Sequence, residues 1–367
     1  MPDLVLLLEL GAIAVLFAGI PLVYLLTRST YSLFQKLNWV LVFMTFDLIV
    51  FGAFTRLTDS GLGCPDWPGC YGTSNPFHAL SDIQQAESAL PSGPVTLMKA
   101  WIEMIHRYLA MTVGALILVQ VAIAFTKVKA LGTSPLWGSL GLLVLVCIQG
   151  AFGAWTVTLK LQPIVVTIHL MLALVLLACL TAYAQQAWEE KLSAVRTLHI
   201  KPLPARLLLI AWITITIQVF LGAWVSTNYA VLACPDFPTC LGEVWPETNW
   251  IEGFTLWRQL GLNAQGEFIS PIALQTIHWA HRLFAILVLV VFSFLGWKSL
   301  QLATPAIPGL KRFAKLLFSL LALQILTGIS NIVFQWPLLA ALLHTAGSAA
   351  LVFCLVRMSY WASWKSL

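Results

Sequence analysis

Long apolar runs dominate the hydrophobic pattern of this chain. Nine can be marked, at about 4–26, 38–57, 98–125, 136–159, 162–184, 206–226, 271–298, 312–335 and 337–361. A helix of about 20 apolar residues spans a bilayer, and in lipid the backbone polar groups must pair within the segment. The pattern therefore predicts an all-α polytopic membrane protein. Because no basic stretch precedes the first run and no small-residue cleavage site follows it, we expect 4–26 to be a retained helix.

The composition supports a membrane protein and argues against a nucleic-acid partner. Hydrophobic residues make up 59% of the 367 residues and charged residues 10%, whereas a soluble domain has about 25% charged residues. The net charge is +5, but the basic residues are scattered among short loops rather than clustered on a soluble module. Membrane lipid is the expected environment, and no nucleic acid is expected to bind.

Basic residues fall mainly on one side of the predicted membrane. They occupy the C-terminal tail and the short loops at 28–37, 126–135, 185–206 and 298–315. The positive-inside rule makes that side the cytoplasm. The two long loops, 58–97 and 227–270, then face the periplasm or the cell exterior. We therefore expect a multi-pass protein of the cell inner membrane, with a cytoplasmic C-terminus.

The sequence contains an internal repeat. Gly52 precedes Cys64 and Cys70 by the same spacings that separate Gly222 from Cys234 and Cys240. A second group recurs with a displacement of 175 residues, in which Gln149, Gly153, His169 and Cys179 correspond to Gln324, Gly328, His344 and Cys354. Such a register indicates two copies of one structural unit. Each copy holds four predicted spans, and both copies have the same orientation.

The repeat predicts the domain organisation of the chain. Residues 1–37 form an extra transmembrane helix and a cytoplasmic loop, and residues 38–184 form the first four-helix repeat. Residues 185–205 form a cytoplasmic linker, 206–361 the second four-helix repeat, and 362–367 a cytoplasmic tail.

Four histidines lie inside the predicted spans. His106 and His169 sit roughly 10–12 Å below the outer surface at 1.5 Å per residue, and His281 and His344 repeat this arrangement. A single buried histidine is more often a core residue bonded to a carbonyl, but four that are paired by depth indicate a site. Two imidazoles on facing helices suit axial ligation of haem iron. Zinc or copper would require three or four ligands.

Three arginines lie near the outer membrane boundary and are candidates for binding haem propionates. They are Arg56, Arg107 and Arg282. Guanidinium groups form charge-assisted hydrogen bonds with carboxylates. The alternative for each is that the side chain extends to the lipid headgroups.

Glu103 distinguishes the first half from the second, where His278 occupies the matching position. Glu103 and His106 share one helix face because they are three residues apart. A carboxylate beside a bound macrocycle can accept a proton or stabilise positive charge, so Glu103 is the candidate catalytic residue. Its alternative role is a structural partner of Arg107 or of an outer-loop lysine such as Lys99. His278 is expected to be a packing or supporting residue rather than a third ligand.

The long loops carry two cysteine pairs, Cys64 with Cys70 and Cys234 with Cys240. Exported loops are the setting in which disulfides form and persist. We therefore expect two disulfides that hold each loop over the outer end of its bundle. Metal binding by the cysteines, or a redox role during assembly, remains an alternative.

These motifs together resemble the haem A synthase family. The resemblance covers residues 38–361 and rests on the run from Gly52 to Cys64, on the Glu103-x-x-His106-Arg107 motif and on the duplicated histidines. It implies oxidation of a methyl group of haem O to a formyl group, which gives haem A for terminal oxidases. Carried over by position, His106 and His169 would hold the substrate haem O. His281 and His344 would ligate a haem B cofactor, and Glu103 would be catalytic.

One departure and two alternatives accompany this resemblance. The family usually has eight spans, so the helix at 4–26 has no assigned role. The alternatives are a di-haem electron-transfer cytochrome and a haem transporter. A cytochrome has no need of a carboxylate beside one haem only, and the spans lack the midplane breaks typical of transporters. The expected partners are a haem O synthase as supplier and an electron donor that the sequence does not identify. Assembly into a homo-oligomer is left open.

Overall fold

The computed structural model of the chain describes residues 27, 32–189, 203–303 and 308–360. Within these ranges the regular elements are helices, apart from isolated bridges in the loops, and eight helices are long and apolar enough to cross a membrane. The predicted all-α membrane fold is therefore confirmed. The predicted first span, 4–26, lies outside the described residues.

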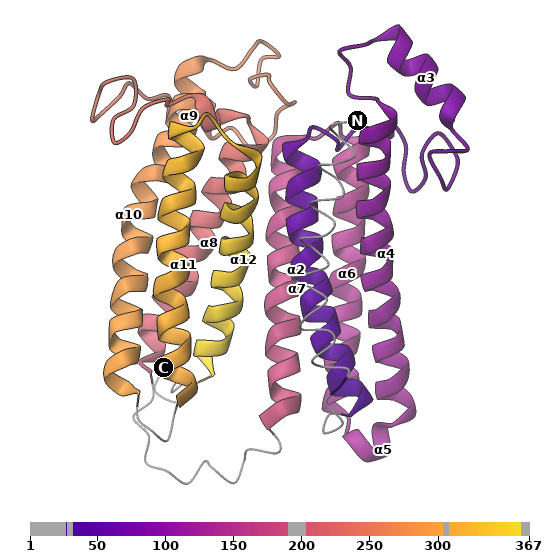
Figure 1. Cartoon of the computed structure of the whole chain (residues 1–367), viewed down its shortest axis with the longest axis vertical. Helices are drawn as coiled ribbons and strands as arrows, with labels where there is room; N and C mark the ends of the chain where they lie inside the picture. Colours follow the sequence, from indigo (N-terminus) through magenta and orange to yellow (C-terminus); the bar gives the residue numbers. More distant parts are fainter. Residues whose placement is uncertain (1–26, 28–31, 190–202, 304–307, 361–367) are drawn as a thin grey trace.

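The long helices form two groups of four that lie side by side (Figure 1). The first group is α2 (Leu33–Leu57), α4 (Leu97–Thr126), α6 (Ser134–Thr158) and α7 (Pro163–Glu189). The second group is α8 (Ala205–Thr227), α10 (Pro271–Leu302), α11 (Pro308–Val333) and α12 (Leu338–Ser359). The short helices are α3 (Leu80–Ala89), α5 (Val128–Leu131), η2 (Ala230–Leu232) and α9 (Trp250–Gly253). The eight long helices agree with the eight predicted spans in these ranges to within a few residues.

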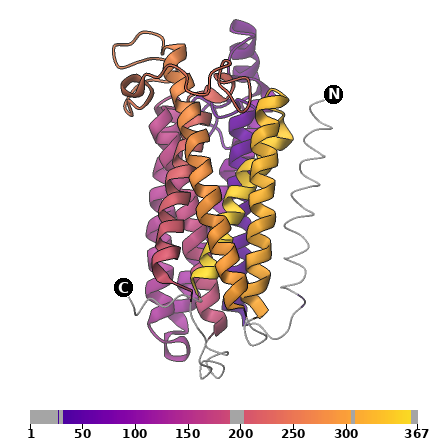
Figure 2. The same cartoon turned by 90° about the vertical axis from the view of Figure 1, so that its left-hand side faces the viewer.

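The two long loops emerge from the same end of the molecule. One loop carries α3 and the other carries α9, and both lie at the top of the bundles in two perpendicular views (Figures 1 and 2). We call this end, with loops 58–96 and 228–270, the loop end. The repeated helices α2 and α8 both run toward it.

Polar capping residues set where several spans begin. Ser32 accepts a hydrogen bond from the backbone N–H of Gln35 (3.3 Å), and the Gln35 side chain accepts one from the Ser32 N–H (3.1 Å). This reciprocal capping box explains why α2 begins earlier than the expected residue 38. Thr96 and Ser270 cap α4 and α10 by accepting from the N–H three residues further on.

Unusual backbone conformations recur at matching positions of the two halves. Asp59 follows α2 with φ of 50°, and Tyr229 follows α8 with φ of 55°. Left-handed residues also occur in the α6–α7 and α11–α12 turns, at Lys160, Leu161, Gln335 and Trp336. These turns are displaced by 175 residues, as the histidines are. The paired turns agree with the predicted repeat.

The two halves share a continuous apolar core. It is formed where α2 and α7 of the first half pack against α8 and α12 of the second. At the loop end a polar contact joins the halves: Arg56 donates to the Ser226 carbonyl (2.8 Å) and to the Tyr229 hydroxyl (2.6 Å). The Tyr229 hydroxyl in turn donates to Asp59 (2.5 Å). This contact fixes the ends of α2 and α8 against each other.

Candidate functional site

Each predicted ligand histidine lies against a glycine of a neighbouring helix. A Cβ atom at Gly52 on α2 would lie 3.0 Å from Cε1 of His106 on α4, and one at Gly222 on α8 would lie 2.9 Å from Cε1 of His281 on α10. The other two pairs are Gly153 with His169 (3.2 Å) and Gly328 with His344 (3.4 Å). The glycines therefore leave space for the imidazole rings inside each bundle, and all four glycine–histidine pairs show this packing.

The histidines of the second half have the separation expected of two ligands to one metal. The ring centroids of His281 and His344 lie 6.4 Å apart, with planes at 77°. Two imidazoles whose nitrogens lie about 2 Å from a metal ion place their centroids roughly 6 Å apart. The donor set of two imidazoles on facing helices fits haem iron.

The first half places the equivalent histidines in one bundle. His106 lies against Gly52 of α2, and His169 lies against Gly153 of α6. The ring of Phe51 lies nearly parallel to that of His106, at 6.3 Å and 9°. Each half therefore holds its two predicted histidines inside its own bundle.

A glutamine supports the later histidine of each half. Nε2 of Gln149 donates to the His169 carbonyl, and Nε2 of Gln324 donates to the His344 carbonyl, both at 3.0 Å. The register predicted this correspondence between the two glutamines. The contacts to the imidazole rings differ between the two halves, however. In the second half Thr327 and Gln218 contact ring nitrogens, and neither residue was predicted from the sequence.

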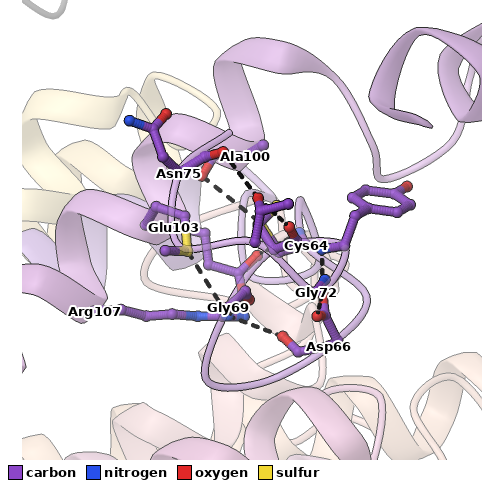
Figure 3. Close-up of a disulfide and its surroundings, with 12 residues drawn as sticks. Cys64, Asp66, Gly69, Gly72, Asn75, Ala100, Glu103 and Arg107 are labelled. Carbon is purple, nitrogen blue, oxygen red and sulfur yellow. Dashed lines mark hydrogen bonds and ion pairs between the residues drawn. A yellow bond between two sulfur atoms is a disulfide. The ribbon is translucent and has the colours of Figure 1, made fainter. Parts of the chain in front are cut away.

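Glu103 is buried beneath the first long loop, with 4% of its surface exposed. One carboxylate oxygen is paired with Arg107, and the other accepts a hydrogen bond from the Cys64 N–H at 2.8 Å. Figure 3 shows the two side chains directed into the disulfide loop. The structure thus contains the Glu103–Arg107 pair that was the alternative role, and it adds the contact with Cys64. Both contacts hold the carboxylate in a fixed position.

Arg107 binds the loop as well as Glu103. Its guanidinium group donates to the carbonyls of Asp66 (2.9 Å), Pro68 (3.3 Å) and Gly69. A guanidinium group has five N–H donors in a planar fork, which suits several carbonyl acceptors at once. Arg107 therefore ties helix α4 to the loop that covers it.

The second half repeats this arrangement without a carboxylate. Arg282 donates to the carbonyls of Asp236 (2.8 Å), Thr239 (2.9 Å) and Cys234 (2.6 Å). Its Nε donates to Nε2 of His278 at 3.2 Å. His278 therefore takes the place of Glu103 as the partner of the arginine, which agrees with a supporting role. The three guanidinium groups predicted to bind propionates all have protein partners here, and their propionate role stays a prediction.

Both predicted disulfides are confirmed. Cys64 is bonded to Cys70 and Cys234 to Cys240, with Cα atoms 4.9 and 4.7 Å apart, and all four cysteines are fully buried. In the second loop Asp236 accepts hydrogen bonds from the Thr239 hydroxyl and from backbone N–H groups. These bonds, the Thr239 bond first, lower the pKa of Asp236 to about 2. Each loop is thus a compact, internally bonded cover.

The fold defines a multi-pass membrane protein with a pair of histidines inside each of two helix bundles and a disulfide-closed loop at the same end of each bundle. A family model described as "Cytochrome oxidase assembly protein" (COX15-CtaA) matches residues 35–356. The heme A synthase of Shewanella oneidensis is 36% identical over 337 residues, which are 90% of this chain and 98% of the relative. The heme A synthase of Brucella anthropi is 26% identical over 347 residues, 87% and 88% of the two chains. The chain belongs to the COX15-CtaA family.

Proposed function

We propose that the two halves have different roles in the oxidation of haem O to haem A. The chain is an oxidoreductase of the haem A synthase family. In this proposal His106 and His169 hold haem O as substrate, and His281 and His344 hold a haem B cofactor. The observation that supports the division is Glu103, because the first half has a buried carboxylate three residues before His106 on α4 and the second half has His278 at the matching position.

Glu103 is the proposed catalytic group. Arg107 and the Cys64 N–H each occupy one acceptor position of the carboxylate, and a carboxylate has about four such positions in all. The remaining lone pairs can accept a proton from a substrate group beside His106. Conversion of a methyl to a formyl group adds one oxygen atom to the carbon and removes protons and electrons from it, so a fixed proton acceptor at that place would speed the reaction. Bound haem B would supply one-electron transfer.

The loops keep water away from this chemistry. Cys64 and Cys70 are fully buried within the first loop, and Arg107 fixes that loop to α4 through three carbonyls. Exclusion of water strengthens the electrostatic interactions of a charged group and prevents side reactions. The first loop is therefore proposed to seal the substrate site and to position Glu103.

We also propose that the loop end faces the periplasm, because basic residues gather at the opposite end. Those within the described ranges include Lys36, Lys127, Lys129, Arg206, Lys298, Lys311, Arg312 and Lys315. A haem O synthase would supply the substrate from the membrane, and a separate electron donor would act on the second half. Family membership supports haem A synthesis over an electron-transfer cytochrome or a transporter.

Pigment analysis tests the proposed activity. The full chain is produced together with a source of haem O, purified, and its pigments are extracted and separated. We expect haem B together with haem O, haem A or an oxidised intermediate. Haem B as the sole pigment would instead identify a cytochrome and contradict the proposal.

A further inference from the structure

The hydrogen bonds of Thr327 determine which nitrogen of His344 is available to a metal. The Thr327 hydroxyl lies 2.7 Å from the Leu323 carbonyl and 2.9 Å from Nδ1 of His344. A hydroxyl has one proton to donate and two lone pairs that accept. Because a carbonyl can only accept, the proton goes to Leu323 and the hydroxyl accepts from Nδ1–H. Nε2 of His344 then carries the free lone pair that a metal needs.

Gln218 contacts the other histidine of the second half. Its amide nitrogen donates to the His281 carbonyl at 3.3 Å and lies 3.2 Å from Nδ1 and 3.5 Å from Nε2 of the His281 ring. An amide NH₂ group has two donors, so Gln218 can hold the backbone of His281 and contact its ring at the same time. Both ligand rings of the second half thus have a polar partner within hydrogen-bond distance of Nδ1.

The first half lacks both partners. In the part of the chain that the structure describes, Nδ1 of His106 and Nδ1 of His169 are buried and have no hydrogen-bond partner. The repeat explains the difference: Phe152 stands where the second half has Thr327, and Leu48 stands where it has Gln218. Neither side chain has an atom that can accept a hydrogen bond from an N–H group.

We propose that Thr327 and Gln218 are positioning residues that make the second half a permanently occupied haem site, and that Phe152 and Leu48 leave the first half exchangeable. A hydrogen bond to the ring nitrogen that does not bind the metal fixes the orientation and tautomer of a ligand histidine and increases electron donation to the metal. A resident cofactor benefits from this support, whereas a substrate that must enter and leave does not. This inference rests on the proposed function, since it requires haem between His281 and His344.

The test measures haem retention and redox potential in the purified full chain. A His169→Ala background restricts the measurement to the second half, and release is followed by transfer of haem to excess apomyoglobin. We expect Thr327→Val, which keeps the shape and removes the hydroxyl, to speed release about 10- to 100-fold. The midpoint potential should rise, because the ligand donates less charge to ferric iron. Thr327→Ser, which keeps the hydroxyl, should restore both values.

Two further variants test the same inference independently of Thr327. Gln218→Leu copies the first half and removes the contacts that hold the His281 ring and backbone, so it should also speed release. Phe152→Thr in a His344→Ala background introduces a hydroxyl beside His169, and it should slow the release of haem from the first half. Unchanged release in Gln218→Leu and Phe152→Thr would contradict the inference even if Thr327→Val were to fold poorly.

The outcomes separate this inference from the proposed function. If His344→Ala keeps the low-spin haem signal of the second half, the proposed haem B site is wrong. If His344→Ala removes that signal while Thr327→Val has wild-type release and potential, the site stands and the positioning role is wrong.

Discussion

Glu103 has two neighbours whose contacts give its carboxylate a structural role besides the proposed catalytic one. Arg107 pairs with one oxygen and the Cys64 N–H binds the other. The sequence suggested Arg107, four residues along the helix, or a loop lysine such as Lys99 as partners, but not Cys64. The Cys64 contact spans 39 residues of chain and depends on how the loop folds back over α4, which spacing alone does not determine.

Glu103→Gln should abolish conversion while leaving the haem content and yield of the protein normal. The amide oxygen of glutamine can still accept from the Cys64 N–H, but the side chain no longer takes up a proton. Loss of general-base catalysis costs about 10²- to 10⁴-fold in rate, so haem O or a stalled hydroxymethyl intermediate should accumulate. Extracted pigments and the yield of folded protein measure this.

Glu103→Ala and His278→Gln complete that experiment. Glu103→Ala removes the loop contacts as well but leaves all four histidines and their helices in place, so we still expect it to fold and carry haem in both halves without conversion. His278→Gln alters the matching arginine partner in the second half and should still allow conversion. Haem A at a normal fraction of bound pigment in Glu103→Gln would rule Glu103 out as the catalytic group.

Gly222→Ala should displace His281 and weaken haem binding in the second half. The new Cβ would lie 2.9 Å from Cε1 of the ring, which is too close for the ring to stay in place. We expect a loss of low-spin haem per protein, measured by absorbance. Gly114→Ala is the matched control, because a Cβ at Gly114 has no atom within 4 Å. Equal haem content in the two variants would contradict the proposed placement of the ring.

Sequence comparison of the halves predicted the histidines but not their supporting residues. The register of 175 residues singled out identical positions, such as Gly153 and Gly328. Thr327 and Phe152 occupy matching positions but differ, so a comparison based on identical residues does not reveal them. The sequence does show the difference, because a polar residue in one half corresponds to an apolar residue in the other beside a duplicated histidine.

At the scale of elements, apolar runs predicted the long helices well, whereas the capped start of α2 and the short loop helices were not predicted. α9 (Trp250–Gly253) is too short to show a period. It is held by the Asn249 cap and by a hydrogen bond from Trp224 Nε1 to the Gly253 carbonyl (2.9 Å). Such tertiary contacts leave no local pattern in the sequence.

Mass mapping of a non-reduced digest should find the two disulfides within their own loops. We expect one peptide pair linked through Cys64 and Cys70 and another through Cys234 and Cys240, as in the structure. A reduced digest is the control. Free thiols at these positions, or a bridge between the halves, would show that the loops close differently.

The whole molecule depends on the contact between the halves, where Arg56, Asp59 and Tyr229 join α2 to α8 at the loop end. The sequence suggested Arg56 only as a propionate candidate, because nothing in the repeat shows which surfaces of the two bundles meet. The guanidinium group also lies 4.0 Å from the centre of the Tyr229 ring. Arg56 therefore has a structural role, and its binding of a propionate stays a prediction.

Tyr229→Phe separates these two roles of Arg56. The change keeps the ring under the guanidinium group and removes the hydroxyl, so we expect a loss of about 1 kcal/mol of stability with unchanged haem content. Arg56→Ala should lower stability further, and it should reduce haem retention only if Arg56 also binds a propionate. Thermal unfolding in detergent and haem absorbance measure the two effects. A Tyr229→Phe variant as stable as wild type would contradict the role of this contact.

The most direct test of the division of roles is the pigment content of two half-specific variants. The full chain, His169→Ala and His344→Ala are each produced with a haem O source and purified, and their pigments are extracted. If the first half holds haem O and the second half holds haem B, we expect haem B without haem O or haem A in His169→Ala, and loss of haem B in His344→Ala. Haem B retained in His344→Ala and lost in His169→Ala would contradict this division of roles, because the two halves would then have the opposite assignments.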